Sequence, residues 1–537
     1  MKQTTNIAYL SMEIAISEKL ANYAGGLGIL AGDFLRSAAD LNLPLVGVTL
    51  LNKEGYFKQK ISRQGQQLEI PELNKLNQLK KLALTIKVNI GPDQVLVDVW
   101  QYLVNNRLPV YFLDTDIPDN KKAYRQLTNH LYGQNSLYRL KQEIILGRGG
   151  VKVLKALGYK IKKYHINEGH GMLSALELLT EMKWKTESEQ RSQLRRQLIF
   201  TNHTPVPGGQ DIFSLNTVLK YQPDFPVNFS DLVINQTINL TRLGVSLAGQ
   251  VNVVSKRHQK TLTSIFPQTK INYITNGVHA ATWTAPEFVK LYNQYIPGWQ
   301  THNNFLKRAS QITLSALDKA HQAAKKRMLK YVAQTTGTVL DHRIFTLVFA
   351  RRFTAYKQPL LLLTDINRLL EINRTKPLQI IYAGKAHPQD QAGKAMIKKI
   401  YTIQKKYQKM IKIVFLENYN ITLAKLLTAG ADLWLNNPLP PNEACGTSGM
   451  KAALNGVPQL SSPDGWWLEA YRPGKNGWII ENSQADDLYQ ILETKILPLY
   501  YQKPLEWQKL MRNAISYNAP IYNSERMVKE YQRRSYS

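Results

Sequence analysis

The sequence predicts an α/β fold made of two doubly wound domains that face each other across a cleft. The first reason is length, because 537 residues are more than one compact core usually holds. The second is that short apolar runs alternate with helical stretches in both halves, as in parallel sheets covered on both faces. The third is that glycines, histidines and cations follow several of these runs, at the strand ends where this architecture binds ligands.

In the first half, strands are expected where β-branched, apolar or aromatic residues form short runs. These runs are 43–51, 95–103, 108–114, 162–168, 197–203 and 251–255. Between them, apolar residues recur at spacings of three and four over 137–158, which predicts a helix. A polar, helix-prone segment from about 286 to 333 separates the two halves. We therefore expect an N-terminal domain at 1–283 and a C-terminal domain at 284–537.

The second half repeats the alternation of strands and helices. Its strand candidates are 344–350, 378–384, 411–417, 431–436 and 457–462. The last stretch is helical again, and Ser524 followed by Glu525 predicts the N-cap of its final helix. Parallel sheets are expected in both halves because the strand runs are almost continuously apolar.

Charge is the most unusual feature of the composition. The chain carries 69 Lys and Arg against 39 Asp and Glu, a formal net charge of +30. This excess would suit nucleic acid, but the basic residues are spread along the chain without a zinc-finger or RNA-recognition pattern. A general basic bias is the simpler interpretation. We expect no nucleic-acid partner and instead an affinity for a small anionic substrate.

Composition and segment lengths also indicate a folded protein without a membrane partner. Hydrophobic residues make up 44% and charged residues 20% of the chain, which is the balance of a globular protein. No apolar run approaches the roughly 18 residues that a membrane-spanning helix needs. Glu13 interrupts the apolar N-terminal stretch, so no signal peptide is expected. The only cysteine, Cys445, excludes an intrachain disulfide framework, and a cytoplasmic location is expected.

Two motifs of the first half could meet ligands. Gly25, Gly26 and Gly28 precede an expected helix, and such a loop can bring backbone amides against a phosphate, although a simple tight turn explains it equally well. Its spacing fits neither the dinucleotide fingerprint nor the P-loop, which argues against NAD and ATP. His170 and His203 each follow a strand, and a buried, hydrogen-bonded histidine explains both. Because no third zinc ligand and no HExxH helix accompany them, we expect no metal.

The second half places cations and a lysine-bearing turn at strand ends. Arg351, Arg352 and Lys357 follow the run 344–350 and would attract phosphate groups, unless they form a solvated basic loop. The stretch EACGTSGMKAALNG (443–456) puts glycines and hydroxyl residues directly before Lys451. Such a turn gathers an anion at a helix start, and Lys451 is either surface charge or an attachment point. These residues alone predict an anion-binding α/β enzyme whose reaction stays open.

Taken together, the motifs resemble the α-glucan phosphorylases, the family of glycogen, starch and maltodextrin phosphorylases, in its shorter bacterial and archaeal branch. The matching runs occur in the family's order from residue 8 to about 470: AYLSMEIAISEKLANYAGGLGILAGDFL, NEGHG, TNHTPVPGGQDIF, TNGVH, FARRFTAYK, AGKAHP, FLENYN and EACGTSGMKAALNGVPQLSSPDGWWLEA. The resemblance implies two Rossmann-like domains of the GT-B type, with the final helices packed back on the N-terminal domain. Since members are often dimers, a homodimer is expected.

The resemblance also implies an activity. The enzyme would transfer the terminal glucose of an α-1,4-glucan to inorganic phosphate and give α-D-glucose 1-phosphate with retention, as in glycogen catabolism. Its cofactor would be pyridoxal 5′-phosphate, whose phosphate exchanges a proton with the substrate phosphate. Such a reaction needs no pair of catalytic carboxylates, unlike glycoside hydrolysis. Two phosphates close together repel strongly in a cleft, which accounts for the clustered cations.

Residues that match the family's motifs take on the family's roles by resemblance. The cofactor set comprises Lys451 as attachment point, Gly446, Thr447 and Ser448 as donors to the cofactor phosphate, Arg351 as a nearby cation, and Tyr419. The substrate-phosphate set comprises Arg352, Lys357 and the amides of Gly25 and Gly26. The glucose set comprises Glu443, Gly446, Asn276, Tyr356, Glu13 in the cleft, and His203 beside the reacting carbon.

Some positions depart from the family's pattern. Cys445 stands where serine is usual, which weakens hydrogen bonding to a hydroxyl. Thr354 and Ala355 replace a His-Glu pair of the long enzymes, and Gln358 replaces a basic residue. These changes bear on phosphate affinity more than on the reaction.

Two other functions are compatible with the same architecture. A sugar-nucleotide-dependent glycosyltransferase, such as a glycogen synthase, would share the cleft and the cations but has no use for a lysine after GTSGM. A non-catalytic glucan-binding relative is the second, and the intact Arg352, Lys357 and Lys451 argue against it. An assay for glucose 1-phosphate separates them.

Overall fold

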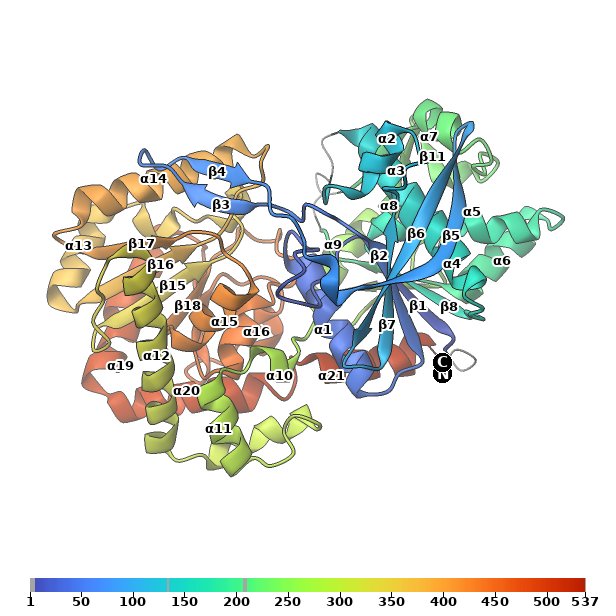
Figure 1. Cartoon of the computed structure of the whole chain (residues 1–537). Helices are drawn as coiled ribbons and strands as arrows, with labels where there is room; N and C mark the ends of the chain where they lie inside the picture. Colours follow the sequence, from blue (N-terminus) through green and yellow to red (C-terminus); the bar gives the residue numbers. More distant parts are fainter. Residues whose placement is uncertain (1–4, 133–134, 206–209, 537) are drawn as a thin grey trace. The chain divides into compact units, whose positions relative to one another are not determined.

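The structure, a computed structural model, describes residues 5–132, 135–205 and 210–536. Its contacts divide the chain into two units (Figure 1). Unit 1 comprises Met1–Phe57, Pro71–Ile274 and Met527–Ser537, and unit 2 comprises Lys58–Ile70 and Thr275–Arg526. Each unit therefore takes in segments that are distant in the sequence. The predicted domain boundary after residue 283 stays a prediction.

Unit 1 is built on a sheet with the strand order β14-β13-β9-β8-β1-β2-β7-β6-β5. The strands from β14 to β7 pair in parallel. The six runs predicted in the first half are confirmed as β2, β6, β7, β8, β9 and β13, whereas β1 and β14 were not predicted. The strands are β1 (Ile7–Ser11), β2 (Leu45–Leu50), β5 (Lys80–Ile90), β6 (Asp93–Val104), β7 (Leu108–Asp114), β8 (Lys163–Asn167), β9 (Leu198–Asn202), β13 (Gln250–Val253) and β14 (Ile271–Tyr273).

The expectation of a wholly parallel sheet is wrong at one edge. There β5, β6 and β7 pair antiparallel. Parallel neighbours need a long crossover connection, whereas Asn105 and Asn106 turn the chain from β6 almost directly into β7. Their φ angles of 50° and 56° are those of a tight hairpin turn.

Helices cover both faces of this sheet, so unit 1 is doubly wound (Figure 1). Along β1, Ala8 and Leu10 pack into the core that α3 and α4 share, whereas Ile7 and Tyr9 pack into the core that contains α1. The predicted helix at 137–158 is confirmed as α3, a π-helical turn and α4. The helices are α1 (Gly26–Asp40), α2 (Lys122–Arg125), α3 (Ser136–Ile144), α4 (Gly150–Ala156), α5 (Ser174–Leu179), α6 (Glu187–Gln197), α7 (Leu215–Tyr221), α8 (Leu240–Leu247) and α9 (Lys256–Ile265).

Unit 1 also has a small antiparallel sheet in the order β10-β12-β11. Its strands are β10 (Ile212–Ser214), β11 (Val233–Ile234) and β12 (Thr237–Asn239). Within the described stretches, none of the helices of either unit has both the length and the hydropathy of a membrane-spanning helix.

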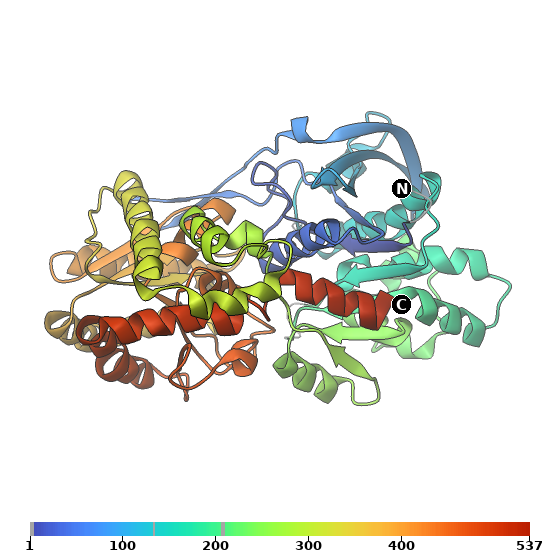
Figure 2. The same ribbon diagram turned by 90° about the horizontal axis from the view of Figure 1, so that it is seen from below.

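The last α-helix, α21 (Ser524–Tyr531), carries side chains into the core of unit 1. Met527 and Tyr531 are buried there. The Tyr531 ring lies 5.7 Å from that of Phe34 on α1, and Figures 1 and 2 show the two helices beside each other. Further along, the Tyr536 hydroxyl lies 2.6 Å from Nδ1 of His165. Unit 1 therefore needs residues from both ends of the chain.

The predicted N-cap of this helix, Ser524, is wrong by one residue. Oδ1 of Asn523 accepts the N–H of Arg526 at 2.9 Å, so Asn523 is the capping residue. Serine and asparagine cap helices about equally well, and the sequence alone did not distinguish the two neighbours.

Unit 2 is built on a parallel sheet in the order β17-β16-β15-β18-β19-β20. The strands are β15 (Phe345–Ala350), β16 (Leu378–Ala383), β17 (Lys412–Leu416), β18 (Leu433–Asn436), β19 (Gln459–Ser461) and β20 (Gly477–Ile479). The strand predictions for 344–350, 378–384, 411–417, 431–436 and 457–462 are confirmed. The predicted α/β class is therefore confirmed in both units.

Helices surround this second sheet (Figure 1). They include the long α12, which starts after Thr313 caps it by accepting the N–H of Ala316. The helices are α10 (Ala280–Trp283), α11 (Pro286–Tyr295), α12 (Leu314–Thr336), α13 (Ile366–Thr375), α14 (Gln391–Tyr407), α15 (Ile421–Gly430), α16 (Ser448–Leu454), α17 (Trp467–Ala470), α18 (Ala485–Ile491), α19 (Leu497–Gln502) and α20 (Pro504–Asn518).

A hairpin from the first part of the sequence, β3 (Lys58–Ile61) and β4 (Gln67–Ile70), belongs to unit 2. Figure 1 shows it beside α14. Two buried amides attach it: Gln59 donates to the Gly384 carbonyl at 2.8 Å, and Gln67 donates to the Ala386 carbonyl at 3.0 Å. These carbonyls belong to the AGKAHP motif, which thus has a structural role.

Candidate active site

In unit 2, three charged side chains meet at the carboxyl ends of neighbouring strands. Arg351 directly follows β15, Lys357 lies on the turn after it, and Glu443 lies on the loop after β18. Arg351 Nη2 donates to Oε2 of Glu443 at 2.6 Å, and Lys357 Nζ donates to the same oxygen. The exposed fractions of these side chains are only 7% to 8%. A buried cluster of two cations and one carboxylate results.

This cluster shifts the ionisation of its members. Burial alone would raise the pKa of Glu443, but Lys357 and Arg351 outweigh it and lower that pKa to about 2. Burial and the charge of Arg351 lower the pKa of Lys357 to about 7, against the opposing effect of Glu443. Arg351 Nε and Nη1 are buried and have no hydrogen-bond partner among the described residues. Donors left over in this way suit an anionic ligand.

The segment after Arg351 is shaped by a tight turn. Lys357 donates its N–H to the Thr354 carbonyl at 3.1 Å, which directs the lysine inward, whereas Arg352 is exposed. The Lys357 ammonium lies 4.4 Å from the ring centroid of Tyr356. Burial is the main reason why the pKa of Tyr356 is raised to about 12. The two cations assigned to the substrate phosphate thus differ sharply in exposure.

Lys451 is not ordinary surface charge. It lies on α16 with a relative exposure of 7%, and its ammonium lies 3.7 Å from the centroid of a Trp283 ring. Gly446 has a φ of +80°, which favours glycine, just before this helix. Ser448 accepts a hydrogen bond from Trp434 Nε1 at 3.2 Å. Of the two interpretations of Lys451, attachment point is the one that burial supports.

The loop that carries Glu443 is held by residues that the sequence reasoning missed. Asp464 is buried; its Oδ2 accepts the N–H of Glu443 and its Oδ1 that of Gly465, both at 2.9 Å. Gly465 has a φ of +55°, and a Cβ there would lie 2.3 Å from the Cys445 carbonyl oxygen. The PDG triplet was the available signal, because Asp and Gly at adjacent positions are typical of tight turns.

Three further residues of the predicted site belong to unit 2 and differ from one another in burial. Asn276 is 4% exposed, and its Oδ1 finds no partner among the described residues. Tyr419 packs partly buried against the core beside β15 and β16. Thr447 immediately precedes α16 and is partly exposed.

In unit 1, Glu13 organises the glycine-rich turn. Its Oε2 accepts the N–H groups of Ala24 at 2.6 Å and Gly25 at 3.2 Å, and its Oε1 accepts the Tyr132 hydroxyl at 2.6 Å. The Gly25 amide is therefore engaged by Glu13 in this structure. Gly26 begins α1, and a Cβ added to it would meet no atom within 4 Å.

His203 follows β9 and is held from two sides. Its ring Nε2 lies 2.7 Å from Oδ1 of Asn167, and its backbone N–H donates to Oε2 of Glu168 at 2.9 Å. Glu168 also accepts from Asn202 and from the Thr204 hydroxyl, each at 3.0 Å. The loop that presents His203 is therefore fixed to the end of β8.

Another cluster in unit 1 contains residue types that bind metals. Each of three residues places one potential ligand atom within 4.8 Å of those of the other two: Glu143, His170 and Asp211. The Arg139 guanidinium, however, donates to Glu143 at 3.1 Å and to Asp211 at 3.0 Å. Arg139 thus already donates to both acidic side chains, and burial followed by the charge of Asp211 raises the pKa of Glu143. The expectation of no metal stays a prediction.

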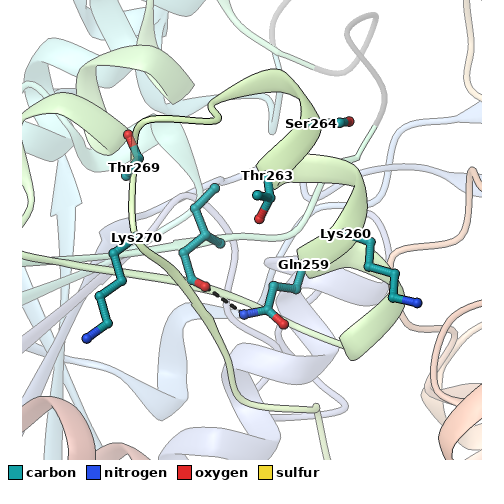
Figure 3. A pocket seen from close by; sticks show the side chains of 7 residues that line it. Gln259, Lys260, Thr263, Ser264, Thr269 and Lys270 are labelled. Atoms are coloured by element: carbon teal, nitrogen blue, oxygen red, sulfur yellow. Dashed lines mark hydrogen bonds between the residues drawn. The ribbon is translucent and has the colours of Figure 1, made fainter.

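A pocket of about 660 Å³ lies on unit 1 between α9 and β14 (Figure 3). Polar side chains line it, and Gln259 donates to the Ile271 carbonyl at 2.7 Å. None of the residues predicted for the site lines this pocket. We therefore do not assign the candidate site to it.

Known proteins are similar to this chain over almost its whole length. A family model described as carbohydrate phosphorylase matches residues 227–515. The maltodextrin phosphorylase of Thermococcus litoralis is 37% identical over 99% of this chain and 70% of its own length. The glycogen phosphorylase of Aquifex aeolicus is 34% identical over 99% of this chain and 86% of its own. The glycogen phosphorylase of Mycobacterium tuberculosis is 34% identical over 98% of this chain and 70% of its own length.

Proposed function

Since this chain belongs to the carbohydrate phosphorylase family, we propose that it is an α-glucan phosphorylase that acts on glycogen or maltodextrin. It would transfer the terminal glucose of an α-1,4-glucan to inorganic phosphate and release α-D-glucose 1-phosphate with retention. The observation that carries this proposal is the buried cluster of Arg351, Lys357 and Glu443, in which Arg351 keeps two unpartnered donors. Such donors are suited to phosphate oxygens.

The same unit fits pyridoxal 5′-phosphate as cofactor. Its aldehyde requires a buried lysine, which Lys451 supplies, and its phosphate requires donors not already paired, which Arg351 offers. In this proposal Lys451 holds the cofactor covalently, and Arg351 and the amides of Gly446, Thr447 and Ser448 hold its phosphate, with Tyr419 at its border. When bound, the cofactor supplies a phosphate group that exchanges a proton with the substrate phosphate.

The residues of the chain then have distinct tasks. Lys357 and the exposed Arg352 attract the substrate phosphate, because two phosphates placed close together need compensating positive charge. The amides of Gly25 and Gly26 are proposed as further donors to this phosphate; that of Gly25 donates to Glu13 in this structure and would have to exchange the carboxylate for the phosphate.

Sugar recognition needs acceptors for hydroxyl groups. Oδ1 of Asn276 is a buried acceptor without a partner in the described part of the chain, which supports its proposed contact with glucose. Glu443 and the Gly446 amide are proposed as further contacts, with Tyr356 at the border of the sugar and His203 beside the reacting carbon. A cytoplasmic location and a homodimer complete the proposal; the buried, unpaired Cys445 suits a reducing compartment.

The decisive experiment supplies the purified protein, loaded with pyridoxal 5′-phosphate, with maltoheptaose and phosphate. Glucose 1-phosphate should appear with time, in proportion to enzyme. Transfer from UDP-glucose or ADP-glucose, without phosphorolysis, would make the protein a sugar-nucleotide glycosyltransferase instead. Glucan binding without either reaction would make it a non-catalytic relative.

The low pKa of Lys357 predicts a particular pH dependence of phosphate binding. The lysine attracts phosphate only while it is protonated, and its pKa without ligand is about 7. Relative to Lys357→Arg, which stays charged, the wild-type affinity should therefore fall as the pH rises above 7, by up to about tenfold per pH unit. Calorimetric titration of both proteins with phosphate between pH 6 and 9 measures the two affinities. The ionisation of phosphate itself cancels in the ratio of the wild-type affinity to that of Lys357→Arg. Parallel curves would contradict the prediction.

A further inference from the structure

Three neighbouring strands of unit 1 end at polar residues that touch one another. Ser11 ends β1 and is directly opposite Asn167, which ends β8. The next strand, β9, pairs with β8 and leads into His203 two residues after Thr201. Because the carboxyl ends of parallel strands lie at the same edge of a sheet, the three side chains form a row there.

The hydrogen bonds along this row have a fixed direction. The backbone carbonyl of Glu13 can only accept, so the Ser11 hydroxyl at 2.8 Å must donate to it. The Ser11 oxygen is then the acceptor for Nδ2 of Asn167 at 3.1 Å. This orients the amide of Asn167 with its oxygen toward His203, 2.7 Å from the ring Nε2. An amide oxygen accepts, and therefore Nε2 must carry the hydrogen.

We propose that Asn167, oriented by Ser11, is a positioning residue that keeps His203 in the neutral form protonated at Nε2, so that Nδ1 is a bare hydrogen-bond acceptor. The tautomer itself follows from the row of hydrogen bonds. Its use in catalysis rests on the function proposed above.

The surroundings of His203 favour the same state. Burial, followed by the nearby His258, His165 and His170, lowers the pKa of His203 to about 3. The carboxylate of Glu168 faces the backbone N–H of His203, where it also accepts from Asn202 and Thr204. A group whose pKa is that low is neutral throughout the physiological range.

Neutrality matters because the transition state of glycosyl transfer carries developing positive charge on the sugar ring. An imidazolium beside the reacting carbon would repel that charge, whereas a neutral ring with a bare nitrogen can accept a hydrogen bond from a hydroxyl. The asparagine suits this task better than an aspartate, because a carboxylate at the same place would favour the charged ring.

The state of the ring can be observed directly. Protein labelled with ¹⁵N-histidine is examined by long-range ¹H–¹⁵N correlation, and the His203 signals are assigned by their loss in His203→Gln. The expected pattern is protonated Nε2 and bare Nδ1, unchanged between pH 6 and 8. A proton on Nδ1, or a titration of this ring in that range, would overturn the proposal.

Two variants test the cause. Asn167→Asp should raise the titration midpoint of His203 by about one to three pH units. Ser11→Ala should release the amide orientation and give a mixture of tautomers. Asn252→Asp is the matched control, since Asn252 is also buried in the same sheet and donates to a serine hydroxyl, Ser535, at 3.4 Å. An unchanged His203 ring in Asn167→Asp would refute the role of Asn167.

Kinetics connect the tautomer to the reaction. In Asn167→Asp, kcat for phosphorolysis should acquire an acid limb at the raised pKa, with a smaller effect on KM for the glucan. A loss of kcat that is uniform from pH 8 down to pH 4 would indicate damage to packing only and would contradict the proposal. If the wild type shows the expected ring state but forms no glucose 1-phosphate, the proposed function fails and the tautomer assignment stands.

Discussion

Replacing Lys451 by alanine is expected to abolish phosphorolysis and the binding of pyridoxal 5′-phosphate together. The reason is that Lys451 offers a buried amine on the short helix α16, and alanine has no group that could bind the cofactor covalently. The absorption band of the bound cofactor and the release of glucose 1-phosphate from maltoheptaose measure the two effects on the same preparation. Both should fall below detection.

Two further variants make this result interpretable. Lys330→Ala removes an exposed lysine of α12 and should leave cofactor content and activity unchanged. Lys451→Arg keeps the positive charge near Trp283 but cannot attach the aldehyde, so it should behave like the alanine variant. Substantial turnover by Lys451→Ala would refute the assignment of Lys451, whatever the cofactor content.

Glu443→Gln is expected to have the second large effect, on stability as well as on activity. The change removes the carboxylate that compensates Arg351 and Lys357 and leaves two buried cations facing a neutral amide. Loss of one partner from a buried ion pair costs about 3–5 kcal/mol, and the ability of Lys357 to give up its proton places this case at the lower end. Glucose 1-phosphate formation should fall on the order of a hundredfold.

Urea unfolding followed by tryptophan fluorescence measures the change in stability. This signal reports mainly on unit 2, because only Trp100 and Trp184 among the tryptophans belong to unit 1. Glu481→Gln is the control; Glu481 is exposed, and its replacement should change the free energy of unfolding by no more than about 0.5 kcal/mol.

The stability difference also has a predicted pH dependence. The pKa of Glu443 is lowered in the folded protein from 4.5 to about 2, so its stabilising effect is present above pH 4.5 and is lost as the pH falls toward 2. The difference in the free energy of unfolding between wild type and Glu443→Gln should therefore become smaller below pH 4.5. A difference in unfolding free energy that stays constant down to pH 3 would show that the charge of the Glu443 carboxylate does not cause the stabilisation.

Much of the fold could be predicted from local sequence, and the failures have physical reasons. Most strands buried on both faces are continuous apolar runs, and these were located, although the buried strand β1 was not among the predicted runs. The edge strand β5 alternates exposed, mostly polar residues with more buried apolar ones and was therefore missed. The hairpin of β3 and β4 was missed because it is polar, and its partner Gly384 lies 325 positions from Gln59. No local pattern contains a contact of that range.

The site shows the same limit. The residue types needed for anion binding were recognised from motifs, since Lys451, Arg351 and Glu443 lie in short distinctive stretches. Their partners were not: the pairing of Glu443 with both cations, and the support of its loop by Asp464, depend on how distant loops meet. Asn167 lay within the NEGHG motif, but its importance became visible only from the direction of its hydrogen bonds.

The placement of Met527 and Tyr531 in the core of unit 1 has a consequence for biosynthesis. The strands of unit 1 leave the ribosome early, yet the aromatic rings that pack on Phe34 and His165 are translated only after all of unit 2. At about 5–20 residues per second, the nascent chain exposes that apolar surface for on the order of ten seconds or more. During this interval it is a natural substrate for chaperones, and ribosomes that stall near the 3′ end of the message would leave an aggregation-prone product.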